Sequence, residues 1–336
     1  MKRKMNIQRN AWLVCMSFVL SLFLFAALTD TASAARKFVR FGGSNPGGSW
    51  YTIAGGITSL FNKEIKDMNA SSVATGGSVD CNRQARKHNL DTWLTHSLHA
   101  YDNWNGVGIF KDEGKFQDFR MLAGVYESWH HFVTLEKSGI KTMSDLAGKK
   151  IAVGSAGSGA ASNSENILKA LGLFDKVKPL YLTFDASGRA MTDGQADAIG
   201  MSSAPMPVIV TVEALHKIHL IALTDKELDM AIKKYPAYKK SIMPAGTYKS
   251  WQKDYPCIGF QVYWMAHKDL DPKVAYDMLK VAFDPKNKDF LAKVHRQLKT
   301  LSPAFDGMQN MGIPLHPGAV KYYKEKGMSV PAVLVK

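Results

Sequence analysis

The stretch KFVRFGGSNPGGSWYTIAGGITSLFNKEI, residues 37–65, contains the pattern from which the fold is predicted. Residues 37–41 are typical of a short strand, and residues 42–51 (GGSNPGGSWY) form a loop rich in Gly and Ser. After this loop, apolar residues recur at helical spacing at Ile53, Ile57 and Leu60. The stretch therefore predicts a strand, a glycine-rich loop and a helix, in that order.

The same order recurs along the chain. A strand at 71–74 leads through 75–78 (TGGS) to a helix at 79–88, which Ser78 is expected to cap, and a strand at 150–153 leads through 154–159 (GSAGSG) to a helix at 161–171. A strand at 196–200 ends in 201–205 (MSSAP). Further strands are predicted at 92–95, 119–125, 131–136, 180–184, 215–223 and 258–266, with helices at 186–193 and 272–283. Strands that alternate with helices predict an α/β fold with mostly parallel sheets flanked by helices.

Composition and length agree with a folded protein of two domains. The 336 residues are 46% hydrophobic and 21% charged, which excludes a long disordered chain and a disulfide-dense scaffold. Cys81 and Cys257 are too few for a disulfide framework. We interpret both as buried thiols, with a single disulfide as the alternative.

The N-terminus has the three parts of a secretory signal peptide. A basic head ends at Arg9, an apolar run covers residues 11–28, and Ala32-Ser33-Ala34 provides a cleavage site. We therefore predict that residues 1–34 are removed and that the protein is periplasmic, with an uncleaved membrane anchor as the alternative. Cleavage removes four basic residues and Asp30, which lowers the formal net charge from +14 to +11. The remaining Lys and Arg are scattered without interleaved aromatic residues, so no nucleic-acid partner is predicted.

Glycine- and serine-rich loops at helix starts predict an anion-binding site. Such loops present backbone N–H groups and hydroxyls at the positive end of a helix, and ligands of open α/β sheets bind at the carboxyl ends of the strands. Known phosphate and catalytic motifs are absent: GSAGSG at 154–159 is neither a Walker A loop nor GxGxxG, and the chain contains no GxSxG or HExxH. We therefore predict a binding protein, with no cofactor and no enzymatic activity.

The histidines leave a metal-binding alternative open. His96 and His99 form an HxxH pair, and together with His130 they would have the ligand type of a transition-metal site. Because no carboxylate pattern supports such a site, no metal is assigned, and His96 is interpreted as a polar contact in a ligand cleft.

Several short motifs together resemble a known family. They are 42–51, 54–56 (AGG), 74–79 (ATGGSV), 101–106 (YDNWNG), 145–149 (DLAGK), 153–159 (VGSAGSG), 244–248 (PAGTY) and 314–319 (PLHPGA). With these motifs in this order, the chain resembles the TAXI-type solute receptors of TRAP transporters. The resemblance implies a two-lobed, type II periplasmic-binding-protein fold, with residues 35–125 plus 245–336 in one lobe and 126–244 in the other.

The resemblance also implies a function and a set of site residues. A monomeric receptor would close its cleft on a small organic anion, such as glutamate or a dicarboxylate, and deliver it to TRAP membrane subunits. A receptor of an ABC importer, a periplasmic enzyme and a metal-binding protein remain as alternatives. Ligand contacts are expected at Ser49, Trp50, Tyr51, Thr75, Gly76, Gly77, Ser78, His96, Ser97, Ser155, Ser158, Gly159, Ala160, Ser202 and Ser203.

The ligand assignment is less specific than the fold. His96-Ser97-Leu98 stands where family members often have Gln-Ser-Asp, and Ala160 stands where Thr is usual. These departures leave a different carboxylate, or a sulfonate, open as the ligand. None of the loops contains arginine, and Arg83 lies on the helix after the second loop. Neutral donors are therefore predicted to hold the anion.

Overall fold

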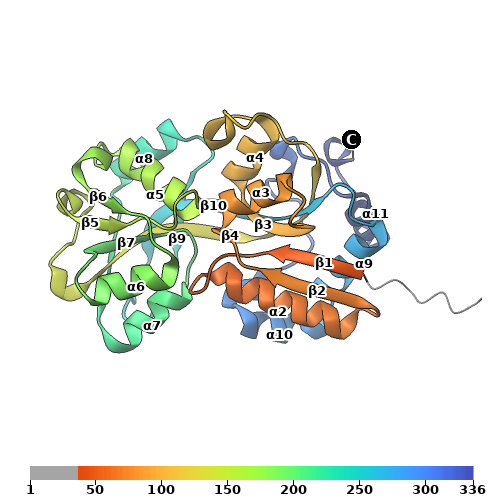
Figure 1. Cartoon of the computed structure of the whole chain (residues 1–336), viewed down its shortest axis with the longest axis horizontal. Helices are drawn as coiled ribbons and strands as arrows, with labels where there is room; N and C mark the ends of the chain where they lie inside the picture. Colours follow the sequence, from red (N-terminus) through yellow and green to blue (C-terminus); the bar gives the residue numbers. More distant parts are fainter. Residues whose placement is uncertain (1–36, 336) are drawn as a thin grey trace, which may run out of the picture. The chain divides into compact units, whose positions relative to one another are not determined.

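The computed structural model describes residues 37–335, and the predicted signal peptide lies outside the described residues. The chain from Phe38 onward forms one compact unit built on a single mixed sheet. The strand order is β2-β1-β3-β10-β4-β7-β5-β6, with β8 paired to β4 and β9 paired to β10 (Figure 1). The predicted α/β class is confirmed.

The first half of the sheet consists of the strand–loop–helix units predicted near the N-terminus. Its parallel strands β1 and β3 pair through Phe41 and Thr92. Each strand is followed by a helix that begins within a few residues of the strand's carboxyl end. The elements are β1 (Lys37–Gly42), α2 (Ser49–Glu64), β2 (Met68–Val73), α3 (Ser78–Arg86), β3 (Thr92–His96) and α4 (Ser97–Asn105).

The second half repeats this arrangement. Strand β5 pairs in parallel with both β6 and β7. The elements are β5 (Lys150–Ala152), α5 (Gly159–Ala170), β6 (Lys178–Leu180), α6 (Phe184–Thr192), β7 (Ala198–Met201), α7 (Pro207–Leu215), β8 (Ile218–Ile221), α8 (Asp225–Lys234) and β9 (Lys239–Met243). The sequence pattern missed α4, α7, α8 and β9. In α7, five of the nine residues are Val, Ile or Leu, so helical periodicity is weak.

Two long antiparallel strands join the halves, and here the prediction of separate strands at 119–125 and 131–136 was wrong. Strand β4 runs without interruption over Phe119–Leu135, and β10 covers Tyr255–His267. Strand β10 pairs with β3 at one end, and β4 pairs with β7 and β8 at the other. The polar residues between the two predicted strands remain in the ladder because β10 pairs with them, including Ser128 opposite Phe260.

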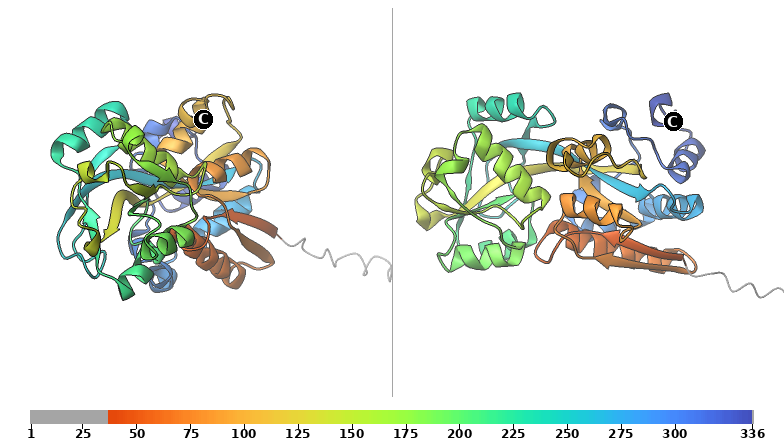
Figure 2. Two further views of the ribbon diagram at one scale, coloured as in Figure 1. Left: turned by 60° about the vertical axis from the view of Figure 1, so that its left-hand side comes forward. Right: turned by 45° about the horizontal axis from the view of Figure 1, so that its top comes forward.

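The C-terminal segment covers the first half of the sheet. Helices α9 (Pro272–Ala282), α10 (Lys288–Val294) and α11 (Pro317–Glu325) are joined by short 3₁₀ turns, and α9 packs against both α2 and α11 (Figure 2). Residues 272–283 were predicted as a helix, which is confirmed.

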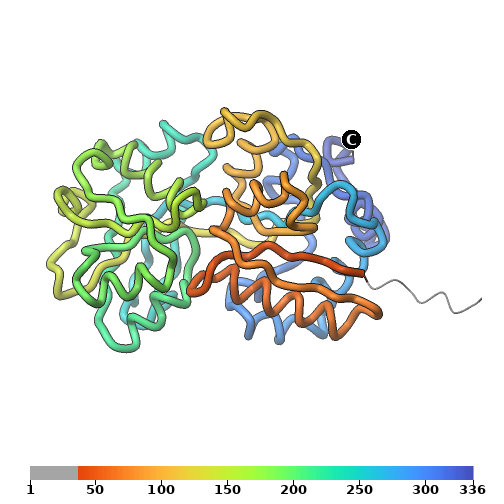
Figure 3. Tube along the Cα trace, viewed as in Figure 1, coloured from red at the N-terminus to blue at the C-terminus, as the bar shows by residue number. Residues whose placement is uncertain are grey.

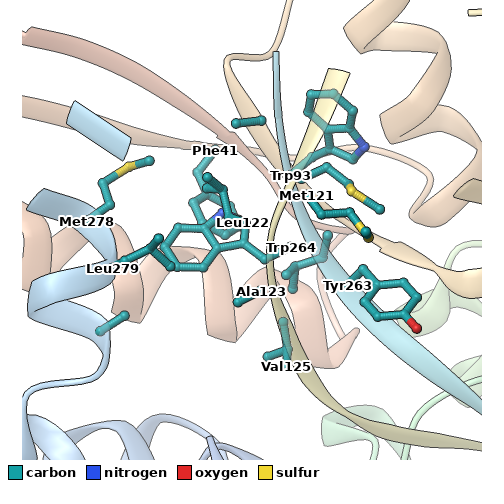
Figure 4. Close-up of a cluster of buried hydrophobic side chains, with 14 of the residues drawn as sticks. Phe41, Trp93, Met121, Leu122, Ala123, Val125, Tyr263, Trp264, Met278 and Leu279 are labelled. Carbon is teal, nitrogen blue, oxygen red and sulfur yellow. The ribbon is translucent and has the colours of Figure 1, made fainter. Parts of the chain in front are cut away.

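The cores follow the two halves of the sheet. Figure 4 shows the largest cluster, in which Phe41 and Trp264 lie among residues from β1, β4, β10 and α9. One further cluster contains Ile199, and another contains Ile151. All buried residues of these two clusters lie between residues 132 and 260. Cys81 and Cys257 are buried and free, as predicted. Among the described residues, no helix has both the length and the apolar character needed to cross a membrane.

Candidate ligand-binding site

A small cavity of about 30 Å³, measured as the space open to the centre of a water molecule, lies where the carboxyl ends of β1, β2, β3, β5, β6 and β7 converge. It is lined by Ser44, Ser49, Trp50, Gly76, Gly77, Ser78, His96, Ala160, Phe184, Ser202, Ser203 and Met206. Three of the four loops identified from the sequence therefore meet around one space, and the fourth, residues 154–159, directly precedes Ala160 of α5.

Most of the predicted contact residues line this cavity, and three lining residues were missed. The predicted residues present are Ser49, Trp50, Gly76, Gly77, Ser78, His96, Ala160, Ser202 and Ser203. Ser44 lies in the first loop but was not singled out there. Phe184 and Met206 are apolar residues of the second half of the sheet. Because such residues usually belong to a core, no local signal distinguishes them from their neighbours.

The remaining predicted residues lie outside the lining, and several have structural roles. Thr75 Oγ1 donates to the Gly43 carbonyl at 2.8 Å and accepts from Gly77 N–H at 2.9 Å, which fixes the turn before α3. Ser158 caps α5 because its hydroxyl accepts from Ala161 N–H at 3.0 Å.

Gly159, Tyr51 and Ser97 also lie outside the cavity lining. A Cβ on Gly159 would lie 2.7 Å from the Cβ of Ser78. This glycine therefore allows α5 and α3 to approach each other closely. Tyr51 is 45% exposed, and Ser97 lines a separate hollow together with Asp102.

The loop after β1 is bonded to segments of the other half of the sheet. Asn45 donates through Nδ2 to Ser155 Oγ at 3.0 Å and accepts from Phe184 N–H at 3.2 Å. Nearby, Val208 N–H donates to the Gly47 carbonyl at 3.2 Å. In Figure 3 this loop, in red, reaches the green segment of the second half. The two halves are therefore in direct contact at the cavity.

Ser78 uses its hydroxyl within the protein. Ser78 Oγ accepts from His96 N–H at 2.9 Å and lies 2.9 Å from both Thr95 Oγ1 and His99 Nδ1. It is the first residue of α3 and not its cap, since the N-cap position belongs to Gly77. Gly77 has φ +104°, a conformation that favours glycine over a residue with a side chain. The predicted capping role of Ser78 was therefore wrong.

Ser202 occupies a similar network in the second half. Its hydroxyl accepts from Asn163 Nδ2 at 3.1 Å and lies 2.9 Å from His130 Nδ1. Asn163 Nδ2 also lies 3.4 Å from His96 Nδ1, so it connects residues of both halves. The neighbouring Ser203 differs, because its buried hydroxyl forms no close hydrogen bond among the described residues and has the Tyr126 hydroxyl as its polar neighbour.

The buried histidines are neutral at neutral pH. Burial lowers the pKa of His99 to about 3 and that of His131 to about 4. Burial likewise lowers the pKa of His96 and of His130 well below the ordinary value of 6.5. The charged imidazolium loses its hydration in the interior, so the neutral ring is favoured.

The Ser–His pairs and the histidine cluster lack the features of catalytic or metal sites. A general base works best with a pKa near the operating pH, and the pKa of His99 lies well below neutral pH. His99 Nε2 also has no partner, whereas a catalytic histidine is normally oriented by a third group. In the part of the chain that the structure describes, no group of three or more His, Cys, Asp or Glu residues is arranged to hold a metal ion.

The cavity lining carries no formal charge. Arg83 forms an ion pair with Glu113 at 2.8 Å, and Arg86 donates to the Glu113 carbonyl at 3.0 Å. Both guanidinium groups pack over the ring of Phe110. These arginines therefore belong to a packed surface beside α3 and do not line the cavity.

Solved structures with the same fold are distant in sequence. A protein of Bordetella bronchiseptica RB50 is 16% identical over 87% of this chain and 98% of that chain, with a TM-score of 0.55. PhnD1 from Prochlorococcus marinus, solved with methylphosphonate, is 12% identical over 82% and 97%, with a TM-score of 0.52. The alkanesulfonate-binding protein SsuA from Xanthomonas axonopodis pv. citri, solved with MOPS, is 13% identical over 90% and 97%, with a TM-score of 0.48. The likeness to the first two structures confirms the predicted periplasmic-binding-protein fold.

The family assignment made from the sequence motifs requires correction. Residues 41–327 match the model of the NMT1-like family. The identification as a TAXI-type receptor of a TRAP transporter was therefore wrong. The chain belongs to the NMT1-like family.

Proposed function

We propose that this member of the NMT1-like family is a periplasmic solute-binding receptor, which captures a small organic anion and delivers it to an ABC-type importer. The observation that carries the proposal is the convergence of the carboxyl ends of six strands, and of the helix starts that follow them, on one cavity. In open α/β sheets this edge is where ligands bind.

The donors around the cavity support an anionic ligand. Helices α2, α3 and α5 all begin at or beside it, with Trp50, Ser78 and Ala160 in its lining. The first N–H groups of a helix have no partner within that helix and carry its positive dipole end. Ser203 adds a buried hydroxyl that forms no close hydrogen bond among the described residues. Together these groups can hydrogen-bond a carboxylate or sulfonate without a cationic side chain.

Capture is proposed to occur by closure of two lobes, residues 35–125 plus 245–336 and residues 126–244. Strand β4 runs from the first segment into the second, β10 pairs along it, and hydrogen bonds such as Ser49 Oγ to the Pro205 carbonyl at 3.1 Å cross the cavity. Bending at the two strands would separate these partners and open the cavity to solvent. This is the hinge motion typical of proteins that enclose a ligand.

The hydrogen bonds made by the hydroxyls in the cavity lining favour binding over catalysis. Its hydroxyls at Ser78 and Ser202 are bonded to neutral histidines, whose lowered pKa values make them poor bases. The ABC class of importer is proposed for the membrane partner because the family match removes the basis for the TRAP assignment.

The test of this function begins with the ligand. The protein is purified gently from the periplasmic fraction, and metabolites released on denaturation are identified by mass spectrometry. We expect one small organic anion at near-equimolar amount, recovered unchanged after incubation with the protein. Chemical conversion of that anion, or binding of none, would contradict the receptor function. Dependence of uptake on ATP hydrolysis, measured in vesicles that contain the importer, tests the ABC assignment separately.

A further inference from the structure

A second and larger hollow, the β10 hollow, is bounded by α4, the turn from α8 into β9, strand β10 and residues 306–311. Helices α4 and α8 both pack against β10 (Figure 1). Its volume of about 780 Å³, measured as for the cavity, lies within the range of small-molecule sites, roughly 300–1,000 Å³. The linings of the cavity and of the β10 hollow have no residue in common.

Aromatic side chains form much of the lining of the β10 hollow. Tyr101 of α4 is 45% exposed, and Tyr235 at the end of α8 is half-buried, so both present accessible ring surface. Tyr238, Phe260 and Tyr263 also line the hollow, and none of them is more than 3% exposed. The face of a tyrosine ring attracts cations.

Two carboxyl groups in the lining have no cationic partner. Asp102 is 8% exposed, and its carboxyl accepts from the backbone N–H of Ile109. Burial raises the pKa of Asp102 to about 6, because the carboxylate loses hydration without gaining a cationic neighbour. Asp306 is exposed and forms no ion pair or side-chain hydrogen bond among the described residues. Carboxylates that lack a counter-ion favour a cationic ligand.

The two lysines of the lining hold their ammonium groups at partners outside it. Lys239 Nζ forms an ion pair with Glu127 at 2.9 Å, and Lys234 Nζ donates to the Lys169 carbonyl at 3.1 Å. Neither Glu127 nor Lys169 lines the β10 hollow. The lysines therefore leave Asp102 and Asp306 unpaired.

A buried hydroxyl in the lining also lacks a partner. Tyr263 is 1% exposed, and its Oη forms no hydrogen bond among the described residues. A Cβ on Gly307 would lie 2.9 Å from this oxygen, so the hydroxyl lies beside another residue of the lining. In Figure 4 it points away from the other labelled side chains. Because buried polar groups normally have a partner, this hydroxyl is available to a bound molecule.

We propose that the β10 hollow is a second ligand site, which takes a small organic cation with an alkylammonium group. The positive charge is matched by the carboxylates of Asp102 and Asp306 and by the rings of Tyr101 and Tyr235. The Tyr263 hydroxyl bonds a polar group of the same molecule. Because this ligand is opposite in charge to the anion proposed for the cavity, the two ligands bind together and do not compete.

Isothermal titration at pH 7.5 with a pair of matched probes tests the proposal. Choline and 3,3-dimethylbutan-1-ol have nearly the same shape, and only choline carries a charge. We expect choline to bind at least about tenfold more tightly than the alcohol, because the carboxylates and the aromatic rings attract only the cation. The affinity for choline should not change when the metabolite retained on purification is present in excess.

Two variants locate the choline site. Tyr101→Ala and Asp306→Asn each remove one recognition group at an exposed position, and each should weaken choline binding by about two- to fivefold. Tyr181→Ala is the matched control, since Tyr181 is 44% exposed but lies outside the lining of the β10 hollow. This control should bind choline like the parent protein.

The outcomes separate this site from the receptor function. Equal affinities for choline and its neutral counterpart, or no binding of either at millimolar concentration, would overturn the cation site and leave the receptor function intact. Displacement of choline by the retained metabolite would assign choline to the cavity and also overturn the second site. Equal losses in Tyr101→Ala and Tyr181→Ala would have the same meaning. Absence of any retained metabolite would contradict the receptor function alone.

Discussion

Two serines that line the cavity are predicted to behave in opposite ways. Ser203→Ala removes a buried hydroxyl that forms no close hydrogen bond among the described residues, so the free energy of unfolding should change less than in Ser78→Ala. The same change removes a donor to the anion and should weaken binding of the retained metabolite by roughly ten- to a hundredfold. Isothermal titration and urea unfolding measure the two effects.

Ser78→Ala is the matched comparison for Ser203→Ala. Loss of Ser78 Oγ leaves His96 N–H without its buried acceptor and disturbs contacts with Thr95 and His99. The free energy of unfolding should therefore fall by about 1–3 kcal/mol. Equal stability of the parent and the Ser78→Ala protein would show that this network contributes nothing.

Protonation of the buried histidines predicts a loss of stability in mild acid. As the pH falls below about 6.5, the unfolded chain binds protons at these rings, whereas the folded protein binds them only near pH 4 at His131 and near pH 3 at His99. Each such ring lowers the free energy of unfolding by at most about 1.4 kcal/mol per pH unit. Asp102, whose pKa is raised to about 6, opposes this loss of stability, because its carboxyl binds a proton at a higher pH in the folded protein than in the unfolded chain. It is one group, whereas several buried histidines act in the other direction.

Urea unfolding at pH 7.5, 6.0 and 5.0 checks this pH dependence. The free energy of unfolding should decrease with each step, and His131→Gln should show a smaller decrease than the parent protein. A free energy of unfolding that stays constant from pH 7.5 to 5.0 is the result that this account does not allow.

At the scale of single elements, Ser158 is predicted to act on α5 and not directly on the ligand. Its hydroxyl caps the helix through Ala161 N–H, and Ser158 does not line the cavity. Ser158→Ala should lower the free energy of unfolding by about 1 kcal/mol, which is the usual contribution of an N-cap side chain. Affinity should fall less than in Ser203→Ala, because α5 keeps its N–H groups at the cavity.

Ser162→Ala is the control for this change. Ser162 lies one turn further along the same helix and donates its backbone N–H to the Ser158 carbonyl, without a side-chain hydrogen bond in the structure. Alanine is a better helix former than serine, so stability should be equal or slightly higher. Similar losses in both variants would mean that Ser158 is not a specific cap.

At the scale of the whole molecule, Asn45 is predicted to hold the two halves of the sheet together. Its side chain bonds both Ser155 Oγ and Phe184 N–H, which belong to the other half. Asn45→Ala removes two hydrogen bonds from the closed arrangement only, so affinity for the retained metabolite should fall by about 5- to 150-fold. Small-angle scattering should show a larger radius of gyration than that of the parent protein at the same ligand concentration.

Asn89→Ala provides the control for closure. Asn89 is exposed, and its side chain bonds Gln84 within the same half. Neither affinity nor radius of gyration should change in this variant. If Asn45→Ala matched Asn89→Ala in both measurements, the bonds across the cavity would have no part in closure.

The sequence by itself determined the strand–loop–helix units and the edge of the sheet at which their loops lie. The run from Lys37 to Glu64 specifies strand, loop and helix because backbone preference and apolar spacing are properties of neighbouring residues. Loops that follow strands must lie at the carboxyl edge, so the positions of Ser49, Gly77 and Ser202 around the cavity could be predicted. The motifs of these loops were not sufficient to assign the family.

Only the tertiary structure decided which groups within the loops face the cavity. Phe184 and Met206 line it because the halves of the sheet pack against each other there, and their apolar character alone predicts a core position. The hydroxyl of Ser78 is occupied by Thr95, His96 and His99, which belong to β3 and to α4 directly after it. Strand β4 is continuous because β10, more than 120 residues later in the chain, pairs along it. Such contacts depend on distances between remote segments, which hydrophobic periodicity and residue spacing do not encode.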